Sequence, residues 1–272
     1  MAFIENQGAK IYWDEQGSGD PLLLIMGLGY PSEAWYRTRP VLAERYRTIA
    51  LDNRGVGRSD MPPGPYPIPL MASDAACVLD AAGVQSAHVF GISMGGMIAQ
   101  EFALQYPNRG RSLILGCTAC GGPHAVRAEA AANEMLLARG NMTGEEAAQA
   151  AIPFIYDPGT PKSRIEEDLT VRRPWYPRSE AYKAQLAGIL AWESYSRLSQ
   201  ISAPTLVIHG DSDRLVPSGN GKLIADHIPG AKWVLLSHAS HIFPTDQPEA
   251  TKQALYQFLG QGISKAGIPQ PA

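Results

Sequence analysis

The chain has 272 residues, of which 23 are basic and 26 acidic, and its formal net charge is −3. Because the two signs nearly balance and no long run of either occurs, composition gives no electrostatic reason to expect a nucleic acid or an anionic membrane surface as partner. Three cysteines are too few for a disulfide framework, and the C-x-x-C spacing of two of them, without further ligands nearby, predicts packing rather than a metal site.

Residues 1–10 lack the pattern of a signal peptide, and no segment approaches the ~18 consecutive apolar residues of a membrane span. We therefore expect a cytoplasmic protein with no membrane partner.

Strands and helices alternate along the first part of the chain. Apolar and β-prone stretches predict strands at 3–5, 10–15, 22–26, 48–51, 87–90 and 111–116. Helices are predicted at 40–46, 72–82 and 96–106. The stretch 62–69 is dense in proline, so no regular structure is expected there. Such alternation is typical of a mainly parallel sheet with helices on both faces.

The pattern changes from about residue 121 to 198, where helix-like segments at 128–139, 143–151 and 179–194 follow one another without strands. Alternation then resumes with strands at 204–209 and 232–236 and helices at 221–227 and 249–259. We predict that residues 1–120 and 199–272 form one α/β core, and that residues 121–198 form a helical cap, or lid, inserted into it. The tail 263–272, with two prolines, is expected to be loosely held.

The stretch 91–95, Gly-Ile-Ser-Met-Gly, matches the nucleophile-elbow pattern G-x-S-x-G. It follows a predicted strand and precedes a predicted helix, which is the context that this motif requires. Small residues at Gly91 and Gly95 let the helix and the strand approach closely, and the helix N-terminus offers free N–H groups to a developing anion. Ser93 is therefore the candidate nucleophile.

A serine hydroxyl needs a base that removes its proton, and the base needs a third group that orients it. His241 follows the last predicted strand, and the chain order nucleophile, acid, histidine favours this position. His238, closer to the strand end, is the rival. Asp211 and Asp213 both follow the strand ending at 209, and either could simply cap the turn. We favour Asp213 as the acid.

An oxyanion hole requires two backbone donors near the developing charge. One is the N–H of Met94, directly after the nucleophile. The other is expected in the loop after strand 22–26, where Leu28 lies between Gly27 and Gly29.

These stretches together resemble the α/β hydrolases of the esterase, lactonase and haloperoxidase-like group. The matching segments are 26–29, 52–59, 91–96, 209–213 and 238–241, and they span most of the chain. The resemblance implies an eight-stranded sheet, a helical cap, and no metal or organic cofactor. It also places the acid of a G-x-x-D pattern on Asp213 and the base on His241. One departure is Met26, which stands where the family usually carries a histidine that supports the oxyanion loop.

The substrate site is less constrained by the sequence. We expect the cap to roof it, and we assign Gly27, Trp35, Trp175 and Trp192 to its walls, which suits an apolar or aromatic acyl or alcohol group. Arg172 and the neighbouring Arg173 are interpreted as a solvated pair, with recognition of a substrate carboxylate as the alternative.

The leading hypothesis is a carboxylic ester hydrolase that acts through an acyl-enzyme with a Ser-His-Asp triad. Lactone hydrolysis and cofactor-free perhydrolysis, the haloperoxidase-like activity, use the same groups and stay open. A ligand sensor that has kept the triad is the non-enzymatic alternative. The expected partner is a small-molecule ester or lactone, and a homodimer is possible on this reading.

Overall fold

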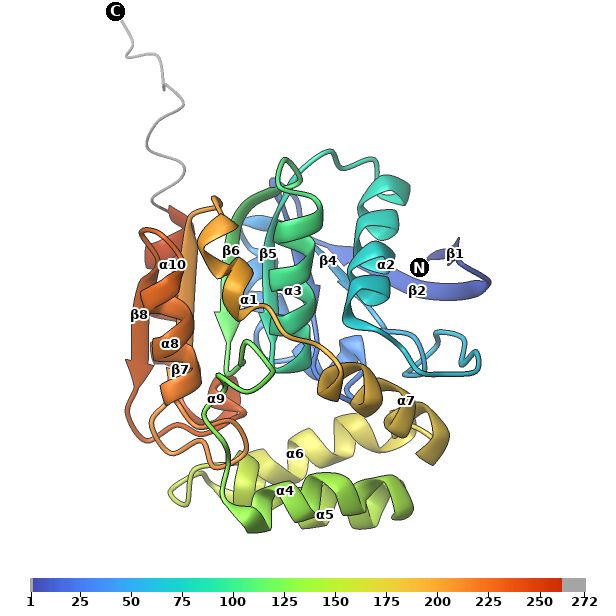
Figure 1. Ribbon diagram of the computed structural model, residues 1–272, viewed down its shortest axis with the longest axis vertical. Helices are drawn as coiled ribbons and strands as arrows, with labels where there is room; N and C mark the ends of the chain where they lie inside the picture. Colours follow the sequence, from blue (N-terminus) through green and yellow to red (C-terminus); the bar gives the residue numbers. More distant parts are fainter. Residues whose placement is uncertain (1, 261–272) are drawn as a thin grey trace, which may run out of the picture.

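The computed structural model describes residues 2–260, which form a sheet with helices packed around it (Figure 1). The sheet has eight strands in the order β1-β2-β4-β3-β5-β6-β7-β8. Strand β2 is antiparallel to β1 and β4, and the other neighbours are parallel. The predicted fold is confirmed. The strands are β1 (Ala2–Asn6), β2 (Ala9–Gln16), β3 (Asp20–Ile25), β4 (Tyr46–Leu51), β5 (Ala87–Ile92), β6 (Gly110–Gly116), β7 (Thr205–Gly210) and β8 (Lys232–Leu236).

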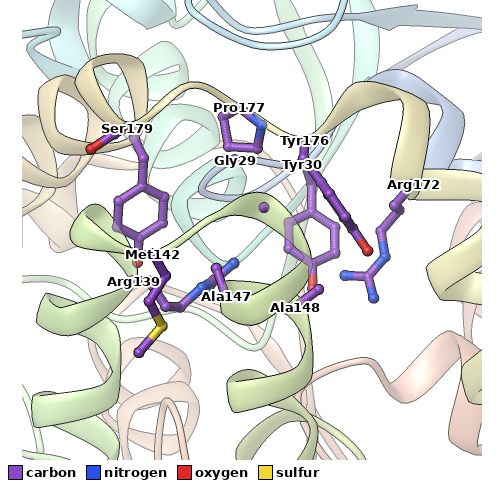
Figure 2. Close-up of a pocket in the computed structure, with 12 residues that line it drawn as sticks. Gly29, Tyr30, Arg139, Met142, Ala147, Ala148, Arg172, Tyr176, Pro177 and Ser179 are labelled. Atoms are coloured by element: carbon purple, nitrogen blue, oxygen red, sulfur yellow. The ribbon is translucent and has the colours of Figure 1, made fainter.

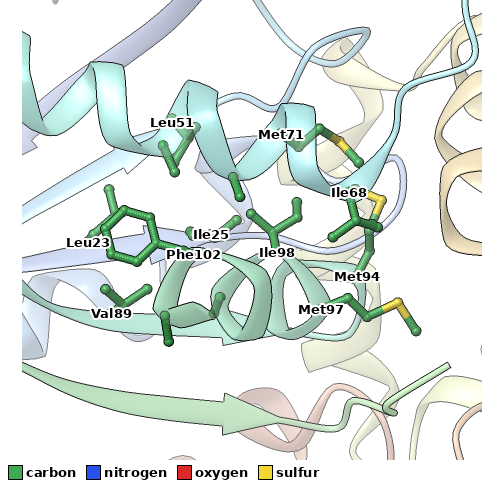
Figure 3. Packing of buried hydrophobic residues seen from close by; sticks show 14 of the residues in the cluster. Leu23, Ile25, Leu51, Ile68, Met71, Val89, Met94, Met97, Ile98 and Phe102 are labelled. Carbon is green, nitrogen blue, oxygen red and sulfur yellow. The ribbon is translucent and has the colours of Figure 1, made fainter. Parts of the chain in front are cut away.

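Alternate residues of the central strands point to opposite faces, and each face has its own core. In β3, Leu23 and Ile25 belong to one apolar cluster, whereas Leu22 and Leu24 belong to the other. The first cluster lies under α2 (Ile68–Ala81), α3 (Met94–Gln105) and α8 (Gly219–His227), and Figure 3 shows its strand residues against Ile98 of α3. The second lies under α1 (Arg39–Ala43), α9 (Phe243–Asp246) and α10 (Pro248–Leu259).

Two local predictions need correction. Helix α2 begins at Ile68, inside the stretch for which no regular structure was expected, because Pro69 occupies its first turn, where a missing N–H costs nothing. Helix α9 was not predicted, since four residues are too few to show helical periodicity. The predicted loose tail, 263–272, lies outside the described residues.

Residues 121–198, here called the cap segment, contain α4 (Ala130–Ala138), α5 (Gly144–Ile155), α6 (Lys162–Arg172) and α7 (Ser179–Leu190). These helices gather at one end of the sheet (Figure 1). Helix α5 begins with a capping box, in which Thr143 and Glu146 exchange hydrogen bonds. Helix α6 was not predicted, since its mostly charged sequence has little apolar periodicity. A β-bridge between Gly121 and Glu193 brings the two ends of the cap segment together.

Short 3-10 helices complete the description: η1 (Ser32–Trp35), η2 (Arg139–Asn141), η3 (Arg173–Trp175) and η4 (Tyr195–Gln200). Over residues 2–260, none of the helices combines the length and the apolar character needed to cross a bilayer.

Candidate active site

Ser93 stands at a sharp turn between β5 and α3, and its backbone adopts φ 58° and ψ −122°. A serine rarely adopts such a conformation, so the surrounding structure must enforce it. The neighbouring glycines make the turn possible. A Cβ at Gly91 would collide with the backbone of Gly95, and a Cβ at Gly95 would collide with the carbonyl oxygen of Ile25 in β3. The hydroxyl of Thr118 donates to the Ser93 carbonyl at 2.7 Å and secures the turn.

An acid and a histidine meet beside this turn. The Nδ1 atom of His241 lies 2.8 Å from Oδ2 of Asp213, and both side chains are buried. The other carboxylate oxygen accepts the backbone N–H groups of Leu215 and Val216 at 3.0 and 2.8 Å. Because the ionised carboxylate only accepts, the proton belongs on Nδ1 of His241, and Nε2 is left unprotonated. An imidazole in this tautomer can accept a proton at Nε2.

A second histidine contacts the same carboxylate. Nε2 of His209 lies 3.2 Å from Oδ2 of Asp213 and 2.7 Å from the carbonyl oxygen of Val216, so this nitrogen carries the proton. Burial alone would raise the pKa of Asp213, but its interactions with His241 and His209 more than offset this effect and hold the pKa well below its usual range. The carboxylate therefore stays charged under all ordinary conditions. His209 itself is a fully buried residue of β7.

The two rival residues lie elsewhere. Asp211 is exposed, and its carboxylate accepts from the backbone of Ala239 at 3.4 Å, which is the turn-capping role considered for one of the two aspartates. His238 is also exposed, with a positive φ of 54° in the turn after β8. Neither borders the cavity at Ser93.

A cavity of about 100 Å³ lies between the strand ends and the cap segment. Ser93, His241, Gly27, Leu28 and Met94 all line it. Within residues 2–260, neither the Leu28 nor the Met94 backbone N–H has a hydrogen-bond acceptor. Donors left free beside a nucleophile are what an oxyanion hole requires. The remaining wall is mostly aliphatic, from Met26, Tyr30, Ile92, Met97, Leu136, Arg139, Ile155, Ile189, Leu215, Val216 and Ile242.

The oxyanion loop is held from both the core and the cap segment. Nδ2 of Asn53 donates to the carbonyl oxygen of Met26 at 2.9 Å. Gln185 of α7 is fully buried, and its Oε1 accepts from the N–H of Gly29 at 2.8 Å while its Nε2 donates to the carbonyl oxygen of Arg54 at 2.9 Å. The side chain of Met26 has no N–H group to donate, so the amides of Asn53 and Gln185 provide the support for the oxyanion loop that a histidine at position 26 would give.

The three tryptophans assigned to the substrate wall do not line this cavity. Trp35 is 1% exposed and packs against Phe90 beneath the sheet, with ring centroids 4.9 Å apart. Trp192 is buried against α3, where its indole N–H donates to Glu101 at 2.8 Å. Trp175 packs under the guanidinium of Arg58, 4.0 Å from the ring centroid. Aromatic composition did not reveal which side of each segment faces the cavity.

Several wall residues that the sequence analysis missed are direct neighbours of residues that it identified. Ile92 precedes Ser93, Ile242 follows His241, and Leu215 and Val216 come just after Asp213. This proximity was a usable signal. The cap contributions could not have been located in the same way, because they carry no motif.

Together, the sheet order and the strained elbow define an α/β hydrolase fold with a nucleophile-type serine at the end of β5. The comparisons with known proteins agree. The chain belongs to the α/β hydrolase fold family, whose family model matches residues 20–248, and it is a hydrolase.

Named relatives extend over nearly the whole chain. A putative carbamate hydrolase RutD from Azorhizobium caulinodans is 34% identical over 266 residues, covering 96% of this chain and 99% of that protein. A poly(3-hydroxyalkanoate) depolymerase from Ectopseudomonas oleovorans is 33% identical over 256 residues, covering 93% and 89%. The structure of a thermophilic esterase from Thermogutta terrifontis is similar with a TM-score of 0.82 and 26% identity, covering 95% and 96%.

Proposed function

We propose that this hydrolase cleaves carboxylic esters through an acyl-enzyme on Ser93, with His241 as general base and Asp213 as its orienting acid. The observation that carries the proposal is the meeting of Ser93 and His241 at one cavity, with Nδ1 of His241 2.8 Å from Asp213. The esterase among the similar structures supports the ester class.

In the acylation step, Oγ of Ser93 attacks the ester carbonyl carbon while its proton passes to Nε2 of His241. The carbonyl oxygen becomes an anion, which the N–H groups of Leu28 and Met94 stabilise. Asp213 stabilises the imidazolium that forms at the same moment. Collapse of the tetrahedral intermediate breaks the bond to the alcohol oxygen, and the alcohol leaves with the proton from Nε2.

In the deacylation step, water takes the place of the alcohol. Nε2 of His241 removes a proton from water as it attacks the acyl carbon, and a second tetrahedral intermediate forms in the same oxyanion hole. Its collapse returns the proton to Oγ of Ser93 and releases the carboxylic acid. The mostly aliphatic wall suits an apolar part of the substrate next to the scissile bond.

The test compares the wild type with Ser93→Ala on p-nitrophenyl esters of graded chain length. We expect kcat to fall by about 10⁴-fold or more, with the fold retained. A fluorophosphonate should label the wild type once, at Ser93 by peptide mass spectrometry. Ser237→Ala is the matched control, because Ser237 is exposed and does not line the cavity. Turnover that survives in Ser93→Ala would refute the proposal.

A second candidate is carbamate hydrolysis, which the printed name of a 34% identical relative favours. The same steps apply, with a carbamoyl group on Ser93 in place of an acyl group. Comparison of kcat/KM for matched esters, lactones and carbamates separates these reactions, and peracid formation from a carboxylic acid and peroxide tests perhydrolysis. A ligand sensor would bind these compounds without turnover.

A further inference from the structure

A second, smaller pocket lies within the cap segment and against the oxyanion loop (Figure 2). Its volume is about 30 Å³, room for two or three water-sized groups and hence for one functional group of a ligand. Twelve residues line it, and none is acidic: Gly29, Tyr30, Arg139, Met142, Gly144, Ala147, Ala148, Arg172, Tyr176, Pro177, Ser179 and Tyr182. We call it the arginine pocket.

Two guanidinium groups enter the arginine pocket from different sides, with the ring of Tyr30 between them (Figure 2). Arg172 is only 5% exposed, which corrects its interpretation as one of a solvated pair. That interpretation holds for Arg173, which is exposed and pairs with Glu145 at 3.0 Å. Arginine stays protonated in proteins, so the pocket carries two positive charges.

Within residues 2–260, neither guanidinium forms a direct ion pair with a carboxylate, and the carboxylate of Asp168 is linked to Arg172 only through the hydroxyl of Tyr156. Arg172 donates to the carbonyl oxygen of Asp168 at 3.1 Å and to the hydroxyl of Tyr156 at 3.3 Å, and its guanidinium lies 4.5 Å from the ring centroid of Tyr30. The carboxylate of Asp168 accepts hydrogen bonds from other side chains, including Nε of Arg37 at 3.1 Å. Among the residues that the structure describes, Arg139 forms no ion pair and packs on the ring of Tyr182.

Two polar atoms of pocket residues are also buried without a partner in the described part of the chain. They are Nε of Arg139 and the hydroxyl oxygen of Tyr176. A buried donor without an acceptor destabilises a fold, so proteins rarely keep one unless something else satisfies it. Both atoms can donate a hydrogen bond. An acceptor in the pocket would satisfy both atoms, and beside two guanidinium groups an anionic acceptor is favoured.

The arginine pocket adjoins the catalytic cavity. Arg139 and Tyr30 line both spaces. Gly29, in the arginine pocket, directly follows Leu28, which borders the catalytic cavity. A ligand whose scissile carbonyl lies at Ser93 can thus extend past Tyr30 toward the two arginines.

We propose that the arginine pocket binds a carboxylate carried by the substrate, so that the preferred esters are anionic half esters of dicarboxylic acids. This inference rests on the proposed function and specifies its substrate class. Planar guanidinium groups match a carboxylate in geometry as well as charge, and the small volume admits a carboxylate without the rest of the molecule.

The experiment measures kcat/KM for monomethyl and dimethyl esters of dicarboxylic acids of graded length. In the wild type we expect the monoanionic ester to be preferred about ten- to a hundredfold at its best length. Arg139→Gln should remove most of this preference, and Arg139→Lys should restore part of it. The ratio of the two substrates is the readout, because it cancels general damage to the cavity. Arg173→Gln, the control, removes a neighbouring exposed charge and should leave the ratio unchanged.

Binding of glutarate to the Ser93→Ala protein, measured by calorimetry, tests the pocket without turnover, and Arg139→Gln in that background should raise its Kd about tenfold or more. Turnover that depends on Ser93 but shows no preference for the monoanionic ester overturns this inference and leaves the proposed function standing. Turnover that survives Ser93→Ala overturns the proposed function, and glutarate binding then decides the pocket alone. If Arg139→Gln changes neither the ratio of kcat/KM for the monoanionic and neutral esters nor the Kd for glutarate, the proposal of a carboxylate site in the arginine pocket is refuted.

Discussion

Replacing Gln185 with alanine tests whether the cap segment positions the oxyanion loop. Gln185 belongs to α7, yet its amide reaches across to two segments of the core, the N–H of Gly29 and the carbonyl oxygen of Arg54. The substitution would remove both bonds at a site that is fully buried.

The magnitude follows from what is left unpaired. Each of the two buried backbone groups left without a partner costs about 1–3 kcal/mol, so Gln185→Ala should lower the free energy of unfolding by roughly 2–6 kcal/mol. Loss of one oxyanion donor lowers kcat by ~10²–10³-fold. The loop keeps its bond from Asn53 to Met26, so we expect a partial displacement of Leu28 and a decrease in kcat of about 10- to 100-fold. KM should change less.

The assay needs a variant that loses similar stability at another site. Gln100 is also fully buried, and its amide bonds the carbonyl oxygens of Gly96 and Ala119 and the hydroxyl of Ser194. Urea unfolding and kcat are measured for Gln100→Ala and Gln185→Ala side by side. If both variants lose similar stability and kcat falls equally in both, Gln185 has no special effect on the loop and the reasoning fails.

Three further predictions concern stability. Gly95→Ala should abolish activity and lower the melting temperature, because the added Cβ would collide with the carbonyl oxygen of Ile25. Gly110→Ala is the control, since its Cβ would meet open space, and it should melt near the wild-type temperature. Equal melting temperatures for the two variants would contradict the predicted collision. Arg54→Met should lower the free energy of unfolding, measured in urea, by about 3–5 kcal/mol. The reason is that the buried Asp74 carboxylate, which lies 2.6 Å from the Arg54 guanidinium, would lose its counter-ion. A decrease below about 1 kcal/mol would be inconsistent with a buried ion pair. Burial raises the pKa of Asp246 from 3.8 to about 6. Between about pH 4 and 6, the folded protein therefore holds a proton on Asp246 that the unfolded chain has released. The free energy of unfolding of the wild type should therefore fall by up to about 3 kcal/mol, relative to Asp246→Asn, as pH rises from about 4 to 6. Parallel pH profiles of unfolding free energy for the two proteins would disprove the raised pKa.

The arrangement of the core could be predicted because its signals are local. A strand such as β3 is a continuous apolar run that only a doubly covered sheet can bury, and helices such as α3 show their period directly. The candidate nucleophile, acid and base followed from one further rule, that parallel strands bring their carboxyl ends to one edge. Ser93, Asp213 and His241 each follow such an end, so their meeting required no knowledge of distances.

The cap segment could not be predicted to the same depth, because its side chains are sorted by contacts between distant elements. Arg172 and Arg173 are adjacent and chemically identical, yet one is buried against Tyr30 and the other exposed beside Glu145. Trp192 was expected at the substrate wall, but Glu101 of α3 offers its indole an acceptor and holds it against the core. Neither the burial of Arg172 nor the position of Trp192 could be predicted from the residues next to it in the sequence.

These contacts between distant elements also bear on how the cap segment can move. The bonds of Gln185 to Gly29 and Arg54 mean that lifting α7 away from the core would unpair the oxyanion loop at the same time. A rigid-body movement of the whole cap segment away from the core would therefore break contacts that shape the catalytic cavity. Helices α4 and α5 are tied down as well, because the hydroxyl of Tyr182 in α7 donates to the carbonyl oxygen of Leu136 at 2.8 Å. The N–H of Ile242, next to His241, donates to the carbonyl oxygen of Ile155 at 2.9 Å, so moving α5 would break a bond beside the candidate base.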